Sequence, residues 1–112
     1  MKLGNLNLEV VDAGLFRLDG GAMFGIIPKT LWQRLIVPDR RNRIILALNS
    51  LLIQSANQNI LVNTGIGDKY DAKLRDIYGI KRLPHLADNL AKHGLKPKDI
   101  NTVIVTHLHF DH

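Results

Sequence analysis

THLHFDH, residues 106–112, holds three of the five histidines of the chain together with one aspartate. Its first residue, Thr106, is also the last residue of INTVIVT, residues 100–106. This run is rich in β-branched residues and predicts a buried strand. A single histidine at a strand end is ordinarily incidental. Three of them with an aspartate predict a metal site, because burying so many titratable groups without a metal would be costly.

The geometry of extended backbone indicates how the first two histidines can share a metal. Alternate side chains of a strand face the same way, so His107 and His109 are predicted to point to one side. By the same alternation, Leu108 and Phe110 are predicted to face an apolar layer.

Asp111 and His112 are adjacent and cannot point together on a straight strand. If the chain curls after Phe110, both can turn toward a second metal, which lies about 3.5–4 Å from the first in two-metal hydrolases. The chain has no cysteine, so disulfides and a cysteine nucleophile are excluded. Imidazole and carboxylate donors without sulfur suit Zn²⁺, with Mn²⁺, Fe or Co²⁺ as alternatives.

Length and composition describe one small globular domain of 112 residues, of which 46% are hydrophobic. The formal charge of +5 favours anionic partners. The basic residues are scattered along the sequence, however, and the only tight cluster is Arg40, Arg41 and Arg43, which argues against a nucleic-acid partner. The most apolar run, residues 44–53, is about half the length that a membrane helix needs, and the N-terminus lacks a signal-peptide core. We therefore expect a cytoplasmic protein with a small-molecule substrate and no membrane partner, and the oligomeric state stays open.

Hydrophobic periodicity predicts strands first, then two helices and a last strand. Strands are expected at residues 6–10, 15–18, 44–54 and 60–63, the last two joined as a hairpin by an Asn-rich turn. A turn is expected at residues 19–21, followed by a short helix with Pro28 in its first turn. The two longer helices are expected over residues 70–78, ending near Gly79, and 84–93, ending at Gly94.

THLHFDH matches the T-H-x-H-x-D-H signature of the metallo-β-lactamase superfamily. The resemblance implies an α/β fold in which residues 1–112 form the N-terminal half of a single αββα sandwich domain. It also implies two Zn²⁺ ions, the first bound by His107 and His109 and the second by Asp111 and His112. By the same resemblance the chain is expected to be a fragment, cut at the signature, with the remaining ligands beyond residue 112.

One residue departs from the family pattern. NTGIG, residues 63–67, resembles the family's D-T-G element, but Asn63 stands where relatives have an aspartate that braces the metal loop. Asparagine keeps the shape and loses the charge, so it is expected to hydrogen-bond but to tune the metal less strongly. His85 and His93 lie on or beside a predicted helix and are expected to be surface residues.

The resemblance further implies a hydrolase in which the metals activate a water, and Asp111 orients it and passes a proton to the leaving group. Residues 19–53 resemble the N-terminal region of lactonase-like members, including quorum-quenching acyl-homoserine lactonases. Met23 and Phe24 are candidates for an apolar wall of the substrate pocket, although both would equally suit packing. The alternatives are a glyoxalase-II-like thioesterase, a nuclease of the same superfamily and a non-enzymatic metal-binding protein. The fragment alone is expected to be inactive.

Overall fold

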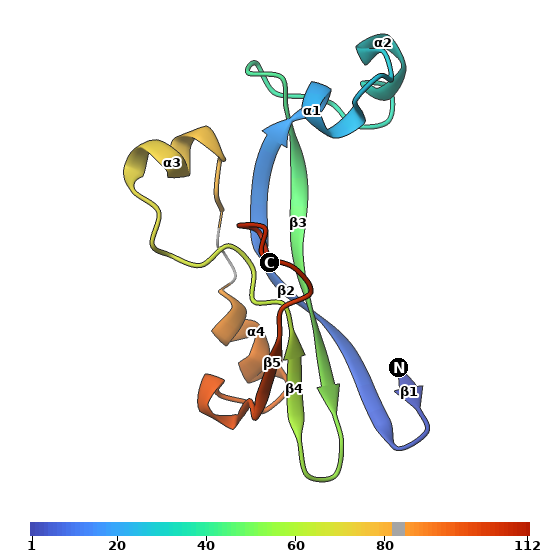
Figure 1. Ribbon diagram of the computed structural model, residues 1–112, viewed down its shortest axis with the longest axis vertical. Coiled ribbons are helices and arrows are strands. Elements are labelled where there is room, and N and C mark those ends of the chain that lie inside the picture. Colours follow the sequence, from blue (N-terminus) through green and yellow to red (C-terminus); the bar gives the residue numbers. More distant parts are fainter. Residues whose placement is uncertain (82–84) are drawn as a thin grey trace.

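The computed structural model describes residues 1–81 and 85–112, and this part of the chain is mixed α/β around one twisted sheet (Figure 1). The strands follow one another across the sheet in chain order: β1 (Lys2–Leu3), β2 (Leu6–Asp19), β3 (Arg43–Gln54), β4 (Asn59–Val62) and β5 (Thr102–Ile104). The helices are α1 (Gly20–Phe24), α2 (Lys29–Trp32), α3 (Ala72–Ile77), α4 (Leu86–Lys92) and the 3₁₀ helix η1 (Pro97–Asp99). Neighbouring strands are antiparallel except β4 and β5, which are parallel.

Strands β3 and β4 confirm the predicted hairpin of central strands. In β3, Ile44, Leu48 and Leu52 are buried, as the alternation of a strand with one face on the core requires. The Asn-rich turn ends β3 at Gln54 and starts β4 at Asn59, each within one residue of its predicted bound. The buried side chains of these two strands form one side of the hydrophobic core.

Strand β2 is one long element, and the prediction of two separate strands was wrong. A β-bulge lies between Asp12 and Leu15, which pair with Asn49 and Ala47. The extra residue shifts the alternation, and so Val11 before the bulge and Phe16 after it both face the core. A sequence pattern broken in this way looks like two short strands.

The predicted turn at residues 19–21 was also wrong, because the chain enters helix α1 there. Asp19 is the N-cap, and its carboxylate accepts hydrogen bonds from Ala22 N at 2.8 Å and Asn42 Nδ2 at 2.8 Å. The Asn42 hydrogen bond is the main reason that the pKa of Asp19 lies below its usual range. Gly20 is buried under the Trp32 ring, which leaves no room for a side chain.

The two predicted longer helices are confirmed, with shorter bounds. Helix α3 has Asp71 as N-cap and ends before Gly79, whose φ of 49° is left-handed. Helix α4 begins at Leu86 and ends before Gly94, with a φ of 73°, while the predicted start at Pro84 lies outside the described residues. Within the described residues, no helix is long and apolar enough to span a membrane.

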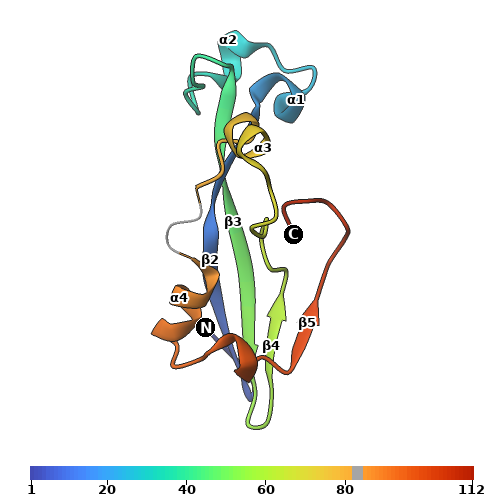
Figure 2. The same cartoon turned by 90° about the vertical axis from the view of Figure 1, so that its left-hand side faces the viewer.

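Strand β5 lies at the edge of the sheet and is not the buried strand that its sequence predicts. It ends at Ile104, and Val103 is 50% exposed. The crossover through α4 brings β5 beside β4, and Figure 2 shows the chain after β5 curling back toward the segment that follows β4. The fold therefore presents the histidine stretch on a loop that leaves an edge strand.

The core consists of two clusters of buried side chains. One joins α4 to β2, β3 and β4 and is made of Val11, Leu52, Leu61 and Leu90. The other lies beyond the bulge, under residues 64–80, and is made of Ala13, Phe16, Leu48 and Ile66. The second cluster supports the loop that carries the histidines, because Phe110 packs against Phe16.

Candidate metal centre

The histidine loop, residues 106–112, bends after β5 and turns again before its end. The bend, and not a straight strand, brings His107 and His109 together, with ring centroids 4.7 Å apart. Leu108, predicted to face the apolar layer, is instead 95% exposed because the chain has already left the sheet. The predicted curl is present, and His112 N donates to His109 O at 3.2 Å.

The curl gathers the four predicted ligands. The ring centroid of His112 lies 4.1 Å from that of His107, and His112 Nε2 lies 3.5 Å from Asp111 Oδ2. The side chains of Asp111 and His112 are 24% and 31% exposed, so both are partly withdrawn from water. Three imidazoles and a carboxylate therefore meet at one turn of backbone.

Asn63 braces the loop from the end of β4, as predicted from the family pattern. Its backbone is left-handed, with a φ of 62°, a conformation that asparagine tolerates better than most residues. Asn63 N donates to Ile104 O at 2.8 Å, and Asn63 Oδ1 accepts from Thr106 N at 3.0 Å and Thr106 Oγ1 at 3.1 Å. Thr64 Oγ1 adds a hydrogen bond of 3.3 Å to His112 O. All four contacts are made by uncharged groups.

Phe110 packs on the apolar side of the loop, as predicted, but its side chain remains 40% exposed. Its ring lies 4.7 Å from that of Tyr78, 5.9 Å from Phe16 and 6.5 Å from Tyr70, measured between centroids. The residue is thus held between aromatic side chains from β2 and from the ends of the α3 segment. The sequence reading missed Tyr70 and Tyr78, and the aromatic residues on either side of a short helix were the available signal.

Arginines at the end of the β2–β3 connection make hydrogen bonds and ion pairs that hold the fold together. Arg43 donates to Asp39 through Nε at 2.9 Å and to Ile77 O through Nη1 at 2.7 Å. The hydrogen bond from the Arg43 side chain is the main cause that lowers the pKa of Asp39 to about 2, and the backbone N–H groups of Arg43 and Arg41 add to it. Arg41 Nη1 lies 2.8 Å from Asp76 Oδ2. Two of the three arginines therefore tie this connection to the end of α3.

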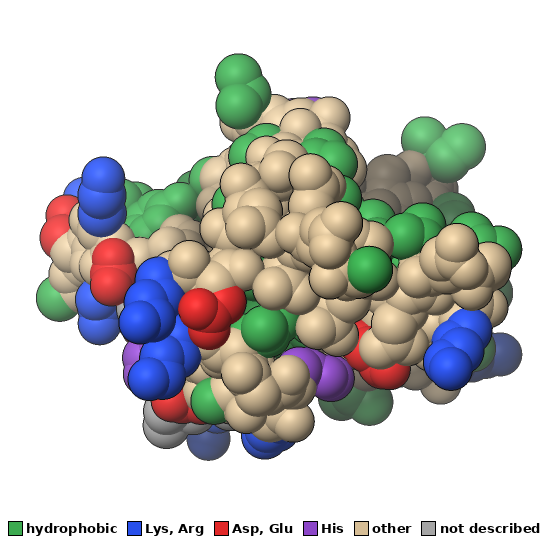
Figure 3. Space-filling model, turned by 90° about the horizontal axis from the view of Figure 1, so that it is seen from below, with side chains coloured by type: hydrophobic (Ala, Val, Ile, Leu, Met, Phe, Trp, Pro, Cys, Tyr) green, Lys and Arg blue, Asp and Glu red, His purple; other side chains and the backbone are tan. Residues whose placement is uncertain are grey.

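Figure 3 shows other basic side chains on one face of the molecule. On the face shown in Figure 3, Lys and Arg lie toward the edges, several beside Asp or Glu, and they do not gather in one patch. That nucleic acid is not the partner stays a prediction.

Met23 and Phe24 lie in α1, which sits at one end of the β2–β3 hairpin (Figure 1). Phe24 stacks on Trp32, with centroids 5.0 Å apart and an interplanar angle of 11°. Met23 is 46% exposed. Phe24 thus has a packing role, while Met23 offers an exposed apolar side chain. Of the two surface histidines predicted on α4, His85 is exposed and His93 is half-buried.

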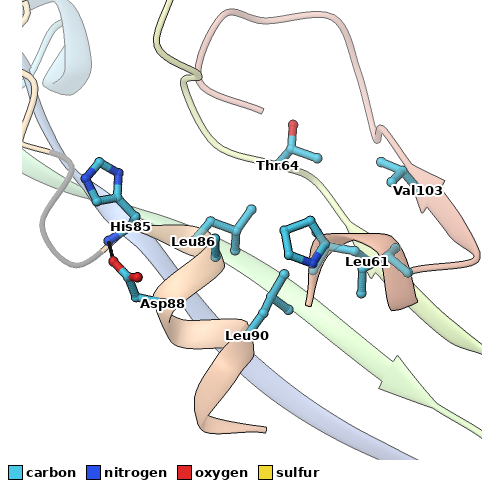
Figure 4. Close-up of a pocket in the computed structure, with 10 residues that line it drawn as sticks. Leu61, Thr64, His85, Leu86, Asp88, Leu90 and Val103 are labelled. Atoms are coloured by element: carbon cyan, nitrogen blue, oxygen red, sulfur yellow. Dashed lines mark hydrogen bonds between the residues drawn. The ribbon is translucent and has the colours of Figure 1, made fainter. Parts of the chain in front are cut away.

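A groove of about 500 Å³ lies between α4, η1 and strands β4 and β5 (Figure 4). Leu61, Leu90 and Val103 form apolar walls, and His85 and Asp88 lie at the start of α4, where His85 N donates to Asp88 Oδ2 at 3.3 Å. None of the four predicted ligands lines this groove. It is separate from the histidine loop, although Thr64 borders both.

The donors of the loop fit a zinc-type ion in kind. Imidazole nitrogen and carboxylate oxygen are the ligands that Zn²⁺ takes in sites without thiolate. Within residues 1–81 and 85–112, however, no three His, Asp or Glu side chains are arranged to hold an ion as they stand. The loop supplies suitable donors in close proximity and not a finished coordination sphere.

The comparisons agree with this geometry. The family model described as the metallo-beta-lactamase superfamily matches residues 45–112. Among solved structures, a probable metal-dependent hydrolase from Staphylococcus aureus is 39% identical with a TM-score of 0.90, covering 100% of this chain and 41% of that one. AidC, a dizinc quorum-quenching lactonase solved with a product, is 26% identical with a TM-score of 0.71, covering 100% and 36%. No curated protein matches the sequence.

A quorum-quenching N-acyl homoserine lactone lactonase, 22% identical with a TM-score of 0.67, shares the fold and covers 100% of this chain and 41% of that one. The chain thus spans 36% to 41% of the length of these structures. The family match takes in more than half of the chain, including Asn63 and the whole histidine loop. On this basis, the chain belongs to the metallo-β-lactamase superfamily.

Proposed function

We propose that the histidine loop provides metal ligands in a lactone hydrolase. The observation that carries the proposal is the convergence of three imidazoles and one carboxylate on a loop braced by Asn63. The 26% identity to a dizinc quorum-quenching lactonase favours a lactone over other carbonyl substrates. His107 and His109 would hold one Zn²⁺ ion, and Asp111 and His112 the other.

Zn²⁺, when bound, would lower the pKa of a water toward about 7 and so supply a nucleophile at neutral pH. Asp111 lies beside His112 and is partly shielded from solvent, a position suited to orienting that water. Attack on the lactone carbonyl carbon breaks the ring C–O bond, and the leaving alkoxide needs a proton. Asp111 takes the proton of the attacking water and delivers it to that oxygen. Met23, exposed on α1, is a candidate contact for an acyl chain.

Zinc content and lactone ring-opening in the intact protein test the proposal. His107→Ala and His109→Ala should each lose bound zinc and turnover together, because each removes a donor from one coordination sphere. His93→Ala is the matched control, since His93 lies at the end of α4 and outside the loop. Zinc content and turnover that persist in both loop variants would overturn the assignment.

The superfamily alternatives are separated by substrate. A thioesterase would hydrolyse acyl thioesters faster than lactones in the same assay. Turnover of neither substrate class, with zinc still bound, would favour a non-enzymatic metal-binding protein.

A further inference from the structure

We infer that Thr106 is a positioning residue that fixes which ring nitrogen of His107 carries the hydrogen, and so leaves Nε2 to face a metal. The inference rests on the proposed function in taking His107 as a ligand. Three hydrogen bonds that link Asn63, Thr106 and His107 carry it.

The orientation of the Asn63 amide is set by the backbone. Thr106 N lies 3.0 Å from Asn63 Oδ1. A backbone N–H can only donate, so the atom that faces it must be the carbonyl oxygen and not the amide nitrogen. The same oxygen lies 3.1 Å from Thr106 Oγ1. Asn63 Oδ1 therefore accepts two hydrogen bonds, one on each lone pair.

The Thr106 hydroxyl has one hydrogen, and Asn63 takes it. A carbonyl oxygen cannot donate, and two oxygens 3.1 Å apart without a hydrogen between them would repel each other. The hydroxyl oxygen keeps its own lone pairs, and His107 Nδ1 lies 2.9 Å from it. Since Thr106 has no hydrogen left to give, Nδ1 must be the donor in this contact.

The consequence for His107 follows from the chemistry of the ring. A neutral imidazole carries a hydrogen on only one nitrogen, so a hydrogen on Nδ1 leaves Nε2 with a free lone pair. A metal ion needs such a lone pair. Asn63, 43 residues before Thr106 in the sequence, thereby sets the chemical form of His107 through the Thr106 hydroxyl. An aspartate would accept the same two hydrogen bonds, so the change to asparagine leaves this hydrogen order intact.

Long-range ¹H–¹⁵N correlation spectra of the metal-free protein, recorded in mildly alkaline buffer, report directly which ring nitrogen carries the hydrogen. Wild-type His107 should carry its hydrogen on Nδ1. Thr106→Val removes the hydroxyl and should abolish this preference, while Thr106→Ser should restore it. Thr102→Val makes the same change in β5, outside the histidine loop, and should leave His107 unaltered.

A second variant keeps the test decisive if Thr106→Val does not fold. Asn63→Gly retains a residue that accepts a positive φ but removes the carbonyl acceptor. The Thr106 hydroxyl is then free to donate to Nδ1, so the tautomer preference should be lost although Thr106 is intact. A role limited to packing would not produce this result.

Zinc affinity, measured by competition with a chromophoric chelator, completes the experiment. Thr106→Val should weaken zinc binding on the order of ten-fold, and Thr106→Ser should not. Hydrogen on Nε2 of wild-type His107, or a tautomer unchanged in both Thr106→Val and Asn63→Gly, overturns the inference. The inferred tautomer in a protein that binds no zinc would instead overturn the proposed function and leave the hydrogen order standing.

Discussion

Asn63 combines three properties at one position: a left-handed backbone, a hydrogen bond to the edge strand and an acceptor for Thr106. Most side chains are strained at a φ of 62°, whereas asparagine is several-fold enriched there. Its neutral amide gives the histidine loop a brace without adding negative charge. Compared with aspartate, asparagine keeps the hydrogen-bond geometry but gives no electrostatic support to a bound cation.

Replacing Asn63 by aspartate should raise zinc affinity. The carboxylate accepts the same hydrogen bonds and adds a negative charge near the donors, so we expect an increase of about ten-fold, in the range found for groups that support metal ligands. Asn63→Gly keeps the backbone conformation, removes the brace and should lower the affinity. Chelator competition at fixed pH and ionic strength measures both. Weaker zinc binding by Asn63→Asp than by wild type would contradict the role of the missing charge.

At the scale of elements, the bulge in β2 and the helix α4 depend on one buried amide. Asn89 is 5% exposed, and its Nδ2 donates at 2.7 Å to Asp12 O, where the bulge begins. A bulge leaves backbone groups outside the ladder, and a buried carbonyl without a partner is costly. Asn89 thus couples the position of α4 to the irregular point of the strand.

Asn89→Ala should lower the free energy of unfolding by about 1–3 kcal/mol, because it leaves the partly buried Asp12 carbonyl without its donor. Urea denaturation followed by circular dichroism measures the change. Lys92→Ala, on the exposed face of the same helix, is the control and should stay within about 0.5 kcal/mol of wild type. Equal stability of the two variants would mean that water replaces the lost hydrogen bond.

The connection between β2 and β3 is held by a second polar group, Asp39. Its pKa is depressed to about 2, so its stabilising effect is complete above the unfolded-state value and is lost as the pH falls through the folded-state value. Asp39→Asn should therefore lower the melting temperature at neutral pH. The difference from wild type should shrink below about pH 4 and vanish near the folded-state pKa.

Melting curves from neutral pH downward test this dependence. The half-buried Glu9 provides the comparison, since Glu9→Gln removes a carboxylate whose ion-pair contact with the N-terminal amine is as long as 3.8 Å. A difference between wild type and Asp39→Asn that stayed constant with pH would show that the ion pair with Arg43 is not its source.

Elements with a local cause were predictable from the sequence, and those with a distant cause were not. The β3–β4 hairpin followed from two apolar runs and an Asn-rich turn, and Gly79 and Gly94 marked the helix ends. The continuity of β2 was hidden because its bulge breaks the alternation. Helix α1 was hidden because it has two glycines at its start and depends on Asn42 and Trp32 for support.

The candidate site divides in the same way. The donor types and the anchoring role of Phe110 were readable from THLHFDH itself. The bend that brings His107 to His112, and the contact of Thr106 with Asn63 across 43 residues, depend on tertiary structure. No local pattern encodes them.

At the scale of the whole molecule, the charge of +5 is spread over the surface, and two of the three clustered arginines are paired. A protein that binds a polyanion through Lys and Arg releases counterions and loses affinity steeply with salt. A neutral lactone releases none. A lactonase and a nuclease should therefore differ in how strongly their activity depends on ionic strength.

Lactone turnover by the intact protein should change little between about 50 and 200 mM salt. Over this range the affinity of proteins that bind nucleic acid through several phosphates falls by orders of magnitude. Arg40→Ala, which removes an exposed member of the arginine cluster, should likewise have little effect on turnover. RNA cleavage is assayed in parallel under the same conditions. Salt-sensitive RNA cleavage that falls in Arg40→Ala, without lactone turnover, would favour the nuclease.

The parallel pairing of β5 with β4 also determines the order in which parts of the molecule form. The β3–β4 hairpin closes through a short turn, whereas Asn59 meets Asn101 only 42 residues later. Closing the longer loop costs more chain entropy, so β5 is expected to dock after the hairpins and α4 have formed. The histidine loop is then expected to assemble after β5 has docked. An ion held by that loop should consequently slow unfolding more than it speeds folding, making the bound metal a source of kinetic persistence.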